Sequence, residues 1–249
     1  MPESSKREDE QRRAFYATYR SGLGTDATSA TGKASESPYL SQLIRRHFPK
    51  DPSARVFEVG CGDGQLLELA RSRGFSAVEG IDLSFEQVER AHRLGRNFVR
   101  LADAITVLGE KEVGSVDVLL AFDVLEHLPE SELLPFLKAA KRALSGQGRL
   151  LIHTVNAQSP FFGRIRYGDF THTTAFTPQS LRQLLFAAGF PNADAIEDSP
   201  VIHGVKSALR ALAWKAIRLA LMAYVTVETG GPGADAIFTQ NFLMVALPA

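Results

Sequence analysis

The chain has 249 residues, of which 45% are hydrophobic and 22% are charged, a balance typical of a globular protein that buries its own core. Lys and Arg together number 28, as do Asp and Glu, so no overall charge favours nucleic acid or a membrane. The single cysteine, Cys61, excludes an internal disulfide framework and is typical of a reducing compartment. The charged N-terminus lacks the apolar segment of a secretory signal, so we expect a cytoplasmic protein.

The first 38 residues predict a short helix followed by a mobile lid. Residues 9–20 follow a helical pattern, whereas residues 21–38 are rich in Gly, Ser and Thr and almost free of large apolar groups. Such a segment cannot offset its ordering entropy by burial. A further helix is expected to follow the lid and to end at Pro49.

From residue 55 the sequence alternates short apolar runs with amphipathic stretches. This alternation predicts an α/β, doubly wound fold, in which a parallel sheet carries helices on both faces. The expected strands are 55–59, 77–81, 98–101, 116–122, 149–154, 192–198 and 237–247, and the expected helices are 65–73, 85–94, 130–144 and 178–188. Residues 145–148, SGQG, are expected to form a turn. In such sheets ligands bind at the carboxyl ends of the strands.

The segment VFEVGCGDG, which ends at Gly64, is the strongest single motif. A strand leads into Gly60, Gly62 and Gly64, where the missing side chains let a ligand touch the backbone. The spacing is GxGxG, with Gln65 where the dinucleotide fingerprint GxGxxG has its third glycine. The turn therefore predicts a cofactor site and argues against a nicotinamide oxidoreductase.

Acidic residues follow the next two strands. Asp82 lies one residue past the second strand and can accept both hydroxyls of a ribose. Asp103 lies past the third strand and can accept from an adenine amino group. Each could instead cap the helix that follows, as Asp does well. Because these features fall at successive strand ends, the sequence favours a nucleotide-type cofactor.

With these motifs the chain resembles the class I S-adenosylmethionine-dependent methyltransferases over residues 39–200 and the final strand. The resemblance implies a seven-stranded sheet whose last strand is antiparallel, with S-adenosylmethionine as cofactor. It implies that Glu58 and the glycines line the methionine end, with Asp82 on the ribose and Asp103 near the adenine. Cys61 would then fill space inside the glycine turn rather than act as a nucleophile.

The fourth strand ends in Phe122, which we expect beside the cofactor, and the segment DVLEH follows it. This segment resembles the ExxEH element of the ubiquinone-pathway O-methyltransferases and the small-RNA 2′-O-methyltransferases, in which two acids and the His hold a divalent cation. The resemblance implies Asp123, Glu126 and His127 as metal ligands, joined by His172. Alternatively, these are polar residues of a strand-to-helix turn, and the short Asp at position 123 favours a site without metal.

Residues 155–178 form a polar and aromatic segment that we expect to lie over the site. Asp169 and His172 could form an orienting pair, which would let one imidazole nitrogen take a hydroxyl proton. With His127 they are the candidate catalytic residues; in the alternative they are ordinary turn and structural residues. The stretch YGDFTHTTAFTPQSL is similar to one in methyltransferases of bacterial surface-polysaccharide gene clusters, which implies a sugar acceptor.

A long helix, residues 205–227, is predicted inside an insertion that precedes the last strand. Apolar residues repeat on one face, basic residues mark the other, and no acid occurs from residue 201 through residue 227. The basic residues are Lys206, Arg210, Lys215 and Arg218. In one interpretation the apolar face packs on the domain. In the other the helix is a surface for an anionic or lipid-linked acceptor, with peripheral membrane contact.

The sequence therefore predicts an N-terminal helix and lid (1–38), a methyltransferase core (39–200), a helical insertion (201–235) and the last core strand (236–249). The expected function is methyl transfer from S-adenosylmethionine to a hydroxyl of a sugar or glycan precursor, free, nucleotide-linked or lipid-linked. A small quinone-like aromatic acceptor, an N-methylated acceptor and a non-catalytic cofactor-binding module are the alternatives. Neutral net charge and the lack of a basic stripe outside the insertion argue against nucleic acid.

Overall fold

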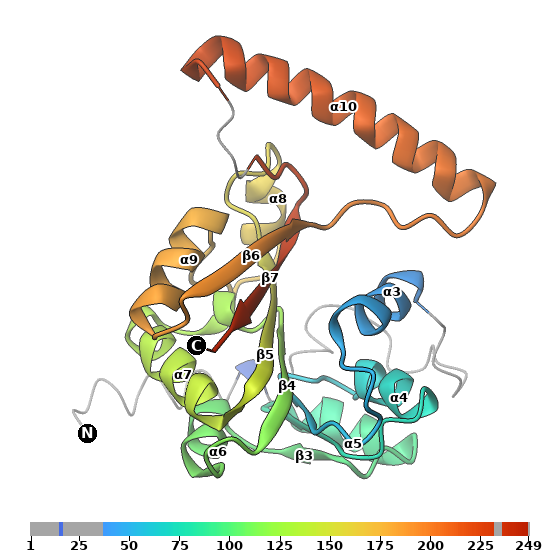
Figure 1. Cartoon of the computed structure of the whole chain (residues 1–249), viewed down its shortest axis with the longest axis vertical. Helices are drawn as coiled ribbons and strands as arrows, with labels where there is room; N and C mark the ends of the chain where they lie inside the picture. Colours follow the sequence, from blue (N-terminus) through green and yellow to red (C-terminus); the bar gives the residue numbers. More distant parts are fainter. Residues whose placement is uncertain (1–14, 17–36, 232–235, 249) are drawn as a thin grey trace.

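The computed structural model describes residues 15–16, 37–231 and 236–248, which form a central sheet with helices around it (Figure 1). The helix and lid predicted over residues 1–38 lie outside the described residues, apart from Phe15, Tyr16 and residues 37–38. Within the described part of the chain, no helix is both long enough and apolar enough to cross a membrane.

Seven strands form one sheet in the order β3-β2-β1-β4-β5-β7-β6. They are β1 (Val56–Val59), β2 (Val78–Asp82), β3 (Val99–Leu101), β4 (Val116–Phe122), β5 (Leu144–Val155), β6 (Asn192–Glu197) and β7 (Asn241–Leu247). β7 runs antiparallel to both of its neighbours, and the other neighbouring pairs are parallel. The doubly wound sheet with an antiparallel last strand, expected from the sequence, is confirmed.

Helices cover both faces of the sheet (Figure 1). One face carries α3 (Pro38–His47), α4 (Gln65–Ser72) and α5 (Phe85–Arg93), and the other carries α6 (Ala104–Glu110), α7 (Glu130–Ala143) and α9 (Pro178–Ala187). Successive strand residues supply the two cores in turn: Val56 and Leu120 pack under the first group of helices, and Phe57 and Leu119 under the second. Burial on both faces explains why these strands read as continuous apolar runs.

Four elements differ from the expectation. The SGQG segment lies inside β5, because Leu144 pairs with Val116 while Arg149 pairs with Val118, and the residues between them bulge from the ladder. A helix that the sequence did not predict, α6, follows β3. Two short helices were also not predicted: η1 (Leu125–His127), which follows β4, and α8 (Phe162–Arg166), which lies in the segment over the site.

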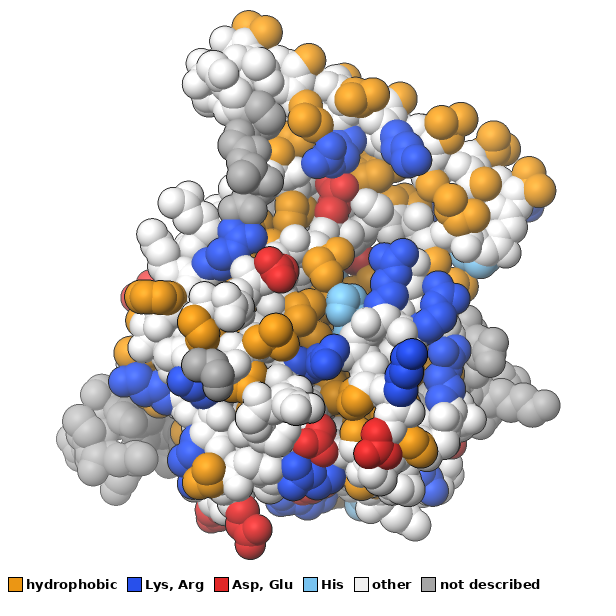
Figure 2. All heavy atoms as spheres, viewed as in Figure 1, with side chains coloured by type: hydrophobic (Ala, Val, Ile, Leu, Met, Phe, Trp, Pro, Cys, Tyr) orange, Lys and Arg blue, Asp and Glu red, His pale blue; other side chains and the backbone are white. Residues whose placement is uncertain are grey.

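The long helix of the insertion, α10 (Val205–Thr229), lies between β6 and β7 in the chain and stands apart from the sheet (Figure 1). Among its residues only Ser207 and Ala211 are buried. Hydrophobic side chains along it are open to solvent (Figure 2). The interpretation in which the apolar face packs on the domain is therefore wrong.

The glycine turn after β1 requires glycine for two separate reasons. Gly60, Gly62 and Gly64 have φ angles of +64°, +55° and +77°, in the left-handed region that disfavours side chains. At Gly64 a Cβ atom would also stand 2.7 Å from Cγ2 of Val99 and 3.1 Å from the Phe98 ring. Gly64 thus lets α4 begin close against the start of β3.

We expect Gly64→Ala to destabilise the protein more than Gly95→Ala. Both positions have positive φ, but a Cβ at Gly95 would meet nothing within 4 Å, so that variant reports backbone strain alone, about 1–2 kcal/mol. Gly64→Ala adds a clash with Val99, worth about a further 1–3 kcal/mol. Urea unfolding of the two variants measures the difference, and equal midpoints would contradict the close packing at Gly64.

Candidate functional site

A cavity of about 400 Å³ opens at the carboxyl ends of the parallel strands. It lies at the ends of β1 and β4, the neighbouring strands between which the strand order reverses and where such folds bind ligands. Its lining comes from the ends of five strands and the segments that follow them, including Gly60, Gly62, Asp82, Asp103, Phe122, Asp123, Glu126, His127, Val155 and His172. Most residues that the sequence assigned to a site are thus assembled at one place.

Asp82 shapes the glycine turn and lines the cavity. Its Oδ2 accepts the Gly62 N–H at 2.7 Å, and its Oδ1 accepts the Ser84 N–H at 2.8 Å. Burial raises the pKa of Asp82, and these backbone donors act against that rise. An ionised carboxylate has about four acceptor positions, so these two bonds leave capacity for ligand hydroxyls.

Asp103 has both of the roles that the sequence left open. Its Oδ1 accepts from the backbone N–H and the hydroxyl of Thr106, each at 2.9 Å, and so caps α6. The same residue lines the cavity beyond β3. Capping and proximity to a ligand are therefore compatible here.

Three residues predicted to bind cofactor do not line the cavity. Glu58 is buried within β1, and its pKa is raised well above the usual range by burial and by the neighbouring Asp82. Within the described part of the chain, its Oε2 atom has no hydrogen-bond partner. Burial raises the pKa of the Cys61 thiol far above neutral pH, which keeps it protonated and supports a space-filling role. Gly64 also lies outside the lining.

His153 on β5 is a site residue that sequence reasoning missed. Its ring stacks on Phe122 with centroids 5.3 Å apart and planes 9° apart. Nδ1 lies 2.7 Å from Oδ1 of Asp123, and Nε2 lies 3.4 Å from Oδ2 of Asp198. Burial opposes protonation of this ring, but the two carboxylates raise its pKa to about 10. A single polar ring within the apolar run RLLIHTV was the available signal.

Asp123 is held by this imidazolium in an unusual backbone conformation. It is the one non-glycine residue in the described chain with positive φ, at +53°. Although burial works against ionisation, the charge of His153 lowers the pKa of Asp123. The ion pair therefore keeps a carboxylate at the end of β4 on the cavity wall.

Glu126 connects the β4 end to the segment over the site. Its backbone carbonyl accepts the N–H of Thr173 at 2.7 Å, and its Oε2 accepts the Thr154 hydroxyl at 2.9 Å. The side chain is fully buried, and Oε1 has no hydrogen-bond partner among the described residues. Burial and the nearby Asp123 raise the pKa of Glu126 to about 8. Glu126 is therefore mainly protonated at neutral pH.

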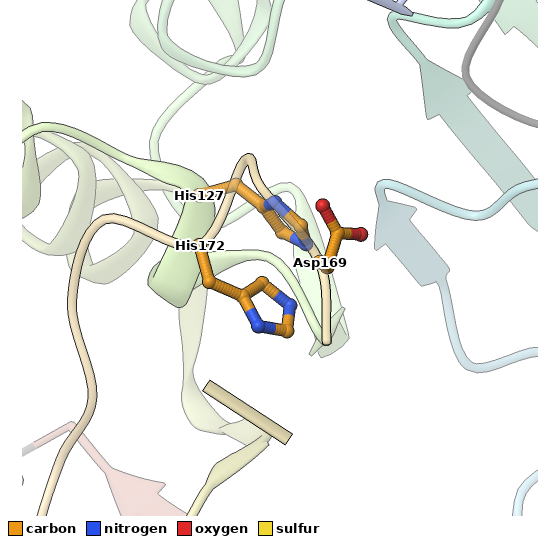
Figure 3. A group of neighbouring side chains, drawn as sticks. All are labelled: His127, Asp169 and His172. Carbon is orange, nitrogen blue, oxygen red and sulfur yellow. The ribbon is translucent and has the colours of Figure 1, made fainter. Parts of the chain in front are cut away.

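His127, Asp169 and His172 form a compact group at the edge of the cavity (Figure 3). One side-chain donor or acceptor atom from each lies within 4.8 Å of those of the other two, and the two imidazole centroids are 4.6 Å apart. Burial, followed by the nearby His172, lowers the pKa of His127 to about 4. Two half-buried rings and one carboxylate therefore share this corner, with His127 neutral at pH 7.

Hydrogen bonds set the proton positions on both rings. Nδ1 of His172 lies 3.1 Å from the Ile165 carbonyl oxygen, which can only accept, so Nδ1 carries the proton. The Thr171 hydroxyl lies 2.6 Å from Oδ1 of Asp169, to which it donates, and it accepts from Nδ1 of His127 at 2.8 Å. These bonds leave Nε2 of each ring as the nitrogen without a proton when that ring carries only one.

This geometry bears on two expectations. Asp169 orients His127 through Thr171, and Nδ1 of His172 donates to the Ile165 carbonyl, so pairing of Asp169 with His172 stays a prediction. The predicted metal ligands are also not brought together as a set, because Asp123 is paired with His153 and Glu126 accepts from Thr154. Within the described residues, the group that could hold a cation contains Asp169 in place of those two acids.

The described N-terminal residues also reach the site. Tyr16 lines the cavity, and its ring lies edge-on to His127 with centroids 6.2 Å apart. Phe15 contacts Phe170 with centroids 5.5 Å apart. Gln87 of α5 also lines the cavity. The sequence did not indicate it, because it does not directly follow a strand and belongs to no motif.

Comparison with known proteins agrees with this geometry. Residues 34–194 match the family described as "Methyltransferase domain". The chain is 30% identical over 166 residues to the ubiquinone biosynthesis O-methyltransferase of Idiomarina loihiensis, a match that covers 61% of this chain and 67% of that protein. The enzyme of the same name from Neisseria meningitidis serogroup A is 32% identical over 41% of this chain, and the chain spans less than half of its length (44%).

A solved structure shows the same fold. The S-adenosylmethionine-dependent methyltransferase from Archaeoglobus fulgidus superposes with a TM-score of 0.62 at 20% identity, over 84% of this chain and 94% of that one. The sheet order, the cavity at the strand reversal and the family match agree with one another. The chain belongs to the methyltransferase domain family and is an S-adenosylmethionine-dependent methyltransferase with the class I fold.

Proposed function

We propose that this chain methylates a hydroxyl group of a quinone-like aromatic acceptor, with His172 taking the hydroxyl proton. The observation that carries the proposal is the position of His172, which lines the cavity while its Nδ1 proton is donated to the Ile165 carbonyl. Nε2 is thereby the basic nitrogen in a residue at the mouth of the cofactor site. This arrangement suits removal of a proton from an acceptor oxygen.

The cavity fits S-adenosylmethionine in size and in chemistry. Its volume of about 400 Å³ is within the usual range for small-ligand sites. At Gly62, which lines the cavity, a Cβ atom would meet only the Gln87 amide, at 3.6 Å or more. Asp82 would accept from the ribose hydroxyls, Asp103 would lie near the adenine, and Phe122 would supply an apolar wall. Glu58 would support the glycine turn from behind.

The chain's own part in the reaction is to align the acceptor and to move one proton. When bound, S-adenosylmethionine supplies a methyl group that is already activated on a sulfonium. His172 accepts the hydroxyl proton at Nε2. His127, neutral because of its low pKa and held by Thr171 and Asp169, packs on the His172 ring and positions it. Glu126 is buried below this group as a mainly neutral acid.

The proposed reaction proceeds without a divalent cation. The predicted set combined two imidazoles with two carboxylates, whereas the observed group holds two imidazoles and one carboxylate, and Mg²⁺ favours oxygen ligands. The base chemistry of His172 does not need a cation to lower the pKa of the hydroxyl.

The relatives support an aromatic acceptor better than the sugar or glycan precursor expected from the sequence. Both curated relatives described above are named for ubiquinone biosynthesis and for O-methylation. Next to the site, Phe161, Tyr167 and Phe170 are 71%, 77% and 86% exposed, and they offer aromatic surface on which a planar ring can stack. A similarity to the polysaccharide-cluster enzymes finds no support in these comparisons.

Asp82→Asn should weaken binding of S-adenosylmethionine about 10- to 100-fold, because a charged acceptor for the ribose hydroxyls is lost. The amide oxygen can still accept one backbone N–H, so the fold should persist. Isothermal titration calorimetry measures the change, with the exposed Asp194→Asn on β6 as a matched control. Unchanged affinity in folded Asp82→Asn would contradict the placement of the cofactor.

His172→Gln should lower kcat at least about 100-fold with a simple catechol as acceptor, while leaving cofactor affinity unchanged. The exposed His203→Gln is the matched control and should retain activity. Activity should also persist in EDTA. A loss in EDTA that Mg²⁺ reverses would contradict the metal-free base, and turnover of a nucleotide sugar but of no catechol would contradict the aromatic acceptor.

Glu126→Gln should stabilise the protein increasingly as pH rises. The folded pKa of about 8 lies above the unfolded value near 4.5, so the native state binds an extra proton between these values. The wild type therefore loses stability as pH rises through this range, whereas the amide does not ionise. Urea unfolding at pH 5 and pH 8 measures the gap in unfolding free energy between the variant and the wild type, with the exposed Glu130→Gln as control. A constant gap would show that Glu126 ionises normally in the folded protein.

A further inference from the structure

Helix α10 directs a continuous apolar stripe away from the protein. Its largest members, spaced for one face of a helix, are between 62% and 88% exposed: Val205, Leu209, Leu212, Leu219 and Val227. The small residues between them on this face, Ala216, Ala220 and Ala223, are also exposed. Hydrophobic side chains line the outer edge of the helix in Figure 2. Monomeric proteins rarely leave so long a stripe uncovered without a binding role.

Contacts on the opposite face fix this orientation. Ser207 and Ala211, the buried residues of the helix, face the body. Arg218 also points inward, where its Nε lies 3.1 Å from Oε2 of Glu197 on β6 and its guanidinium donates to the Ala236 carbonyl. Helical spacing in the sequence placed Arg218 on the basic face, but its side chain binds the body instead. These contacts hold the opposite face of the helix against the body, so the apolar stripe points outward.

Cations flank the stripe on both sides. At 100° per residue, Lys206 falls beside one margin of the stripe with Arg210 further round on the same side, Lys215 falls beside the other margin, and all three are exposed. No acidic residue occurs from residue 201 through residue 227. Lys and Arg side chains are visible on the helix and on the body below it in Figure 2. An apolar face bordered by cations and free of acids complements an anionic, partly apolar surface.

We propose that α10 docks this protein on a membrane surface that contains anionic lipid. The leucine and valine side chains would enter the boundary between headgroups and acyl chains, and the flanking cations would reach lipid phosphates. A helix of this length, about 37 Å at 1.5 Å per residue, would lie along the surface.

Charge favours lipid over a second copy of the chain as the occupant. In a symmetric dimer the same face meets itself, so the cations around one stripe would approach those around the other. The stripe and its margins contain no acidic residue before Glu228 that could compensate these cations. Lipid phosphates supply that compensation directly. The proposal rests on α10 alone and does not depend on the identity of the methyl acceptor.

Vesicle flotation of the full chain tests the proposal. We expect at least about tenfold more binding to phosphatidylcholine vesicles that contain about one third phosphatidylglycerol than to phosphatidylcholine alone, and a decrease as salt is raised. The triple variant Leu209→Gln, Leu212→Gln and Leu219→Gln should lose this binding at unchanged charge. The triple variant Lys206→Gln, Arg210→Gln and Lys215→Gln should lose the preference for anionic vesicles.

Matched controls carry the same kinds of change elsewhere. Phe186→Gln on α9 removes a 72% exposed apolar side chain, and Lys138→Gln on α7 removes an exposed cation, and neither should alter flotation. Circular dichroism checks that each variant is folded. If the leucine variant unfolds, the vesicle preference of the charge variant still tests the proposal.

Three results would overturn the proposal. The wild type could fail to bind anionic vesicles, or both α10 variants could bind as the wild type does. Light scattering could also show a wild-type dimer that the leucine variant dissociates, which would assign the stripe to a second copy.

Discussion

The reversal of strand order between β1 and β4 is the constraint on which the site depends. These strands are parallel neighbours, yet the chain leaves β1 toward β2 and leaves β4 toward β5, so their following segments diverge. A crevice must open between the two connections. Asp82 then connects the glycine turn after β1 to the end of β2 by accepting the Gly62 N–H, which gives the crevice one rigid wall.

The other wall is built from residues that are far apart in the sequence. The carbonyl of Glu126, just after β4, accepts the N–H of Thr173, which brings His172 beside His127. Behind them, His153 of β5 forms an ion pair with Asp123 and stacks on Phe122. Burial lowers the pKa of His127 and raises that of Glu126, whereas the two neighbouring carboxylates raise the pKa of His153. At neutral pH the result is a neutral His127, a protonated Glu126 and a charged His153.

Helix α10 is held in place by other interactions than the helices around the sheet. The helices around the sheet bury apolar faces, as the cores under α4 and α7 show, whereas α10 buries little and exposes its apolar stripe. Its attachment depends on polar contacts such as the Arg218–Glu197 pair. A helix held this way can present the stripe to another surface without unfolding the domain.

Local patterns in the sequence determined the strands, most helices, the glycine turn and the acids at the strand ends. The reason is that hydrophobic periodicity, left-handed glycine and strand-end position are properties of short segments. The doubly wound class and the cofactor followed from these patterns together with the resemblance they carry. Asp82 and Asp103 line the cavity as expected, because parallel strands bring their carboxyl ends to one edge.

Only the tertiary structure decided which polar groups pair. Sequence spacing grouped Asp123 and Glu126 with His127, but the fold gives Asp123 to His153 and Glu126 to Thr154, and brings Asp169 to His127 through Thr171. The outward direction of the α10 stripe was likewise undetermined, because a helical period shows that a face is apolar and not what it meets. The choice of polar partner and the direction of an apolar face depend on contacts between distant segments. No local pattern contains these contacts.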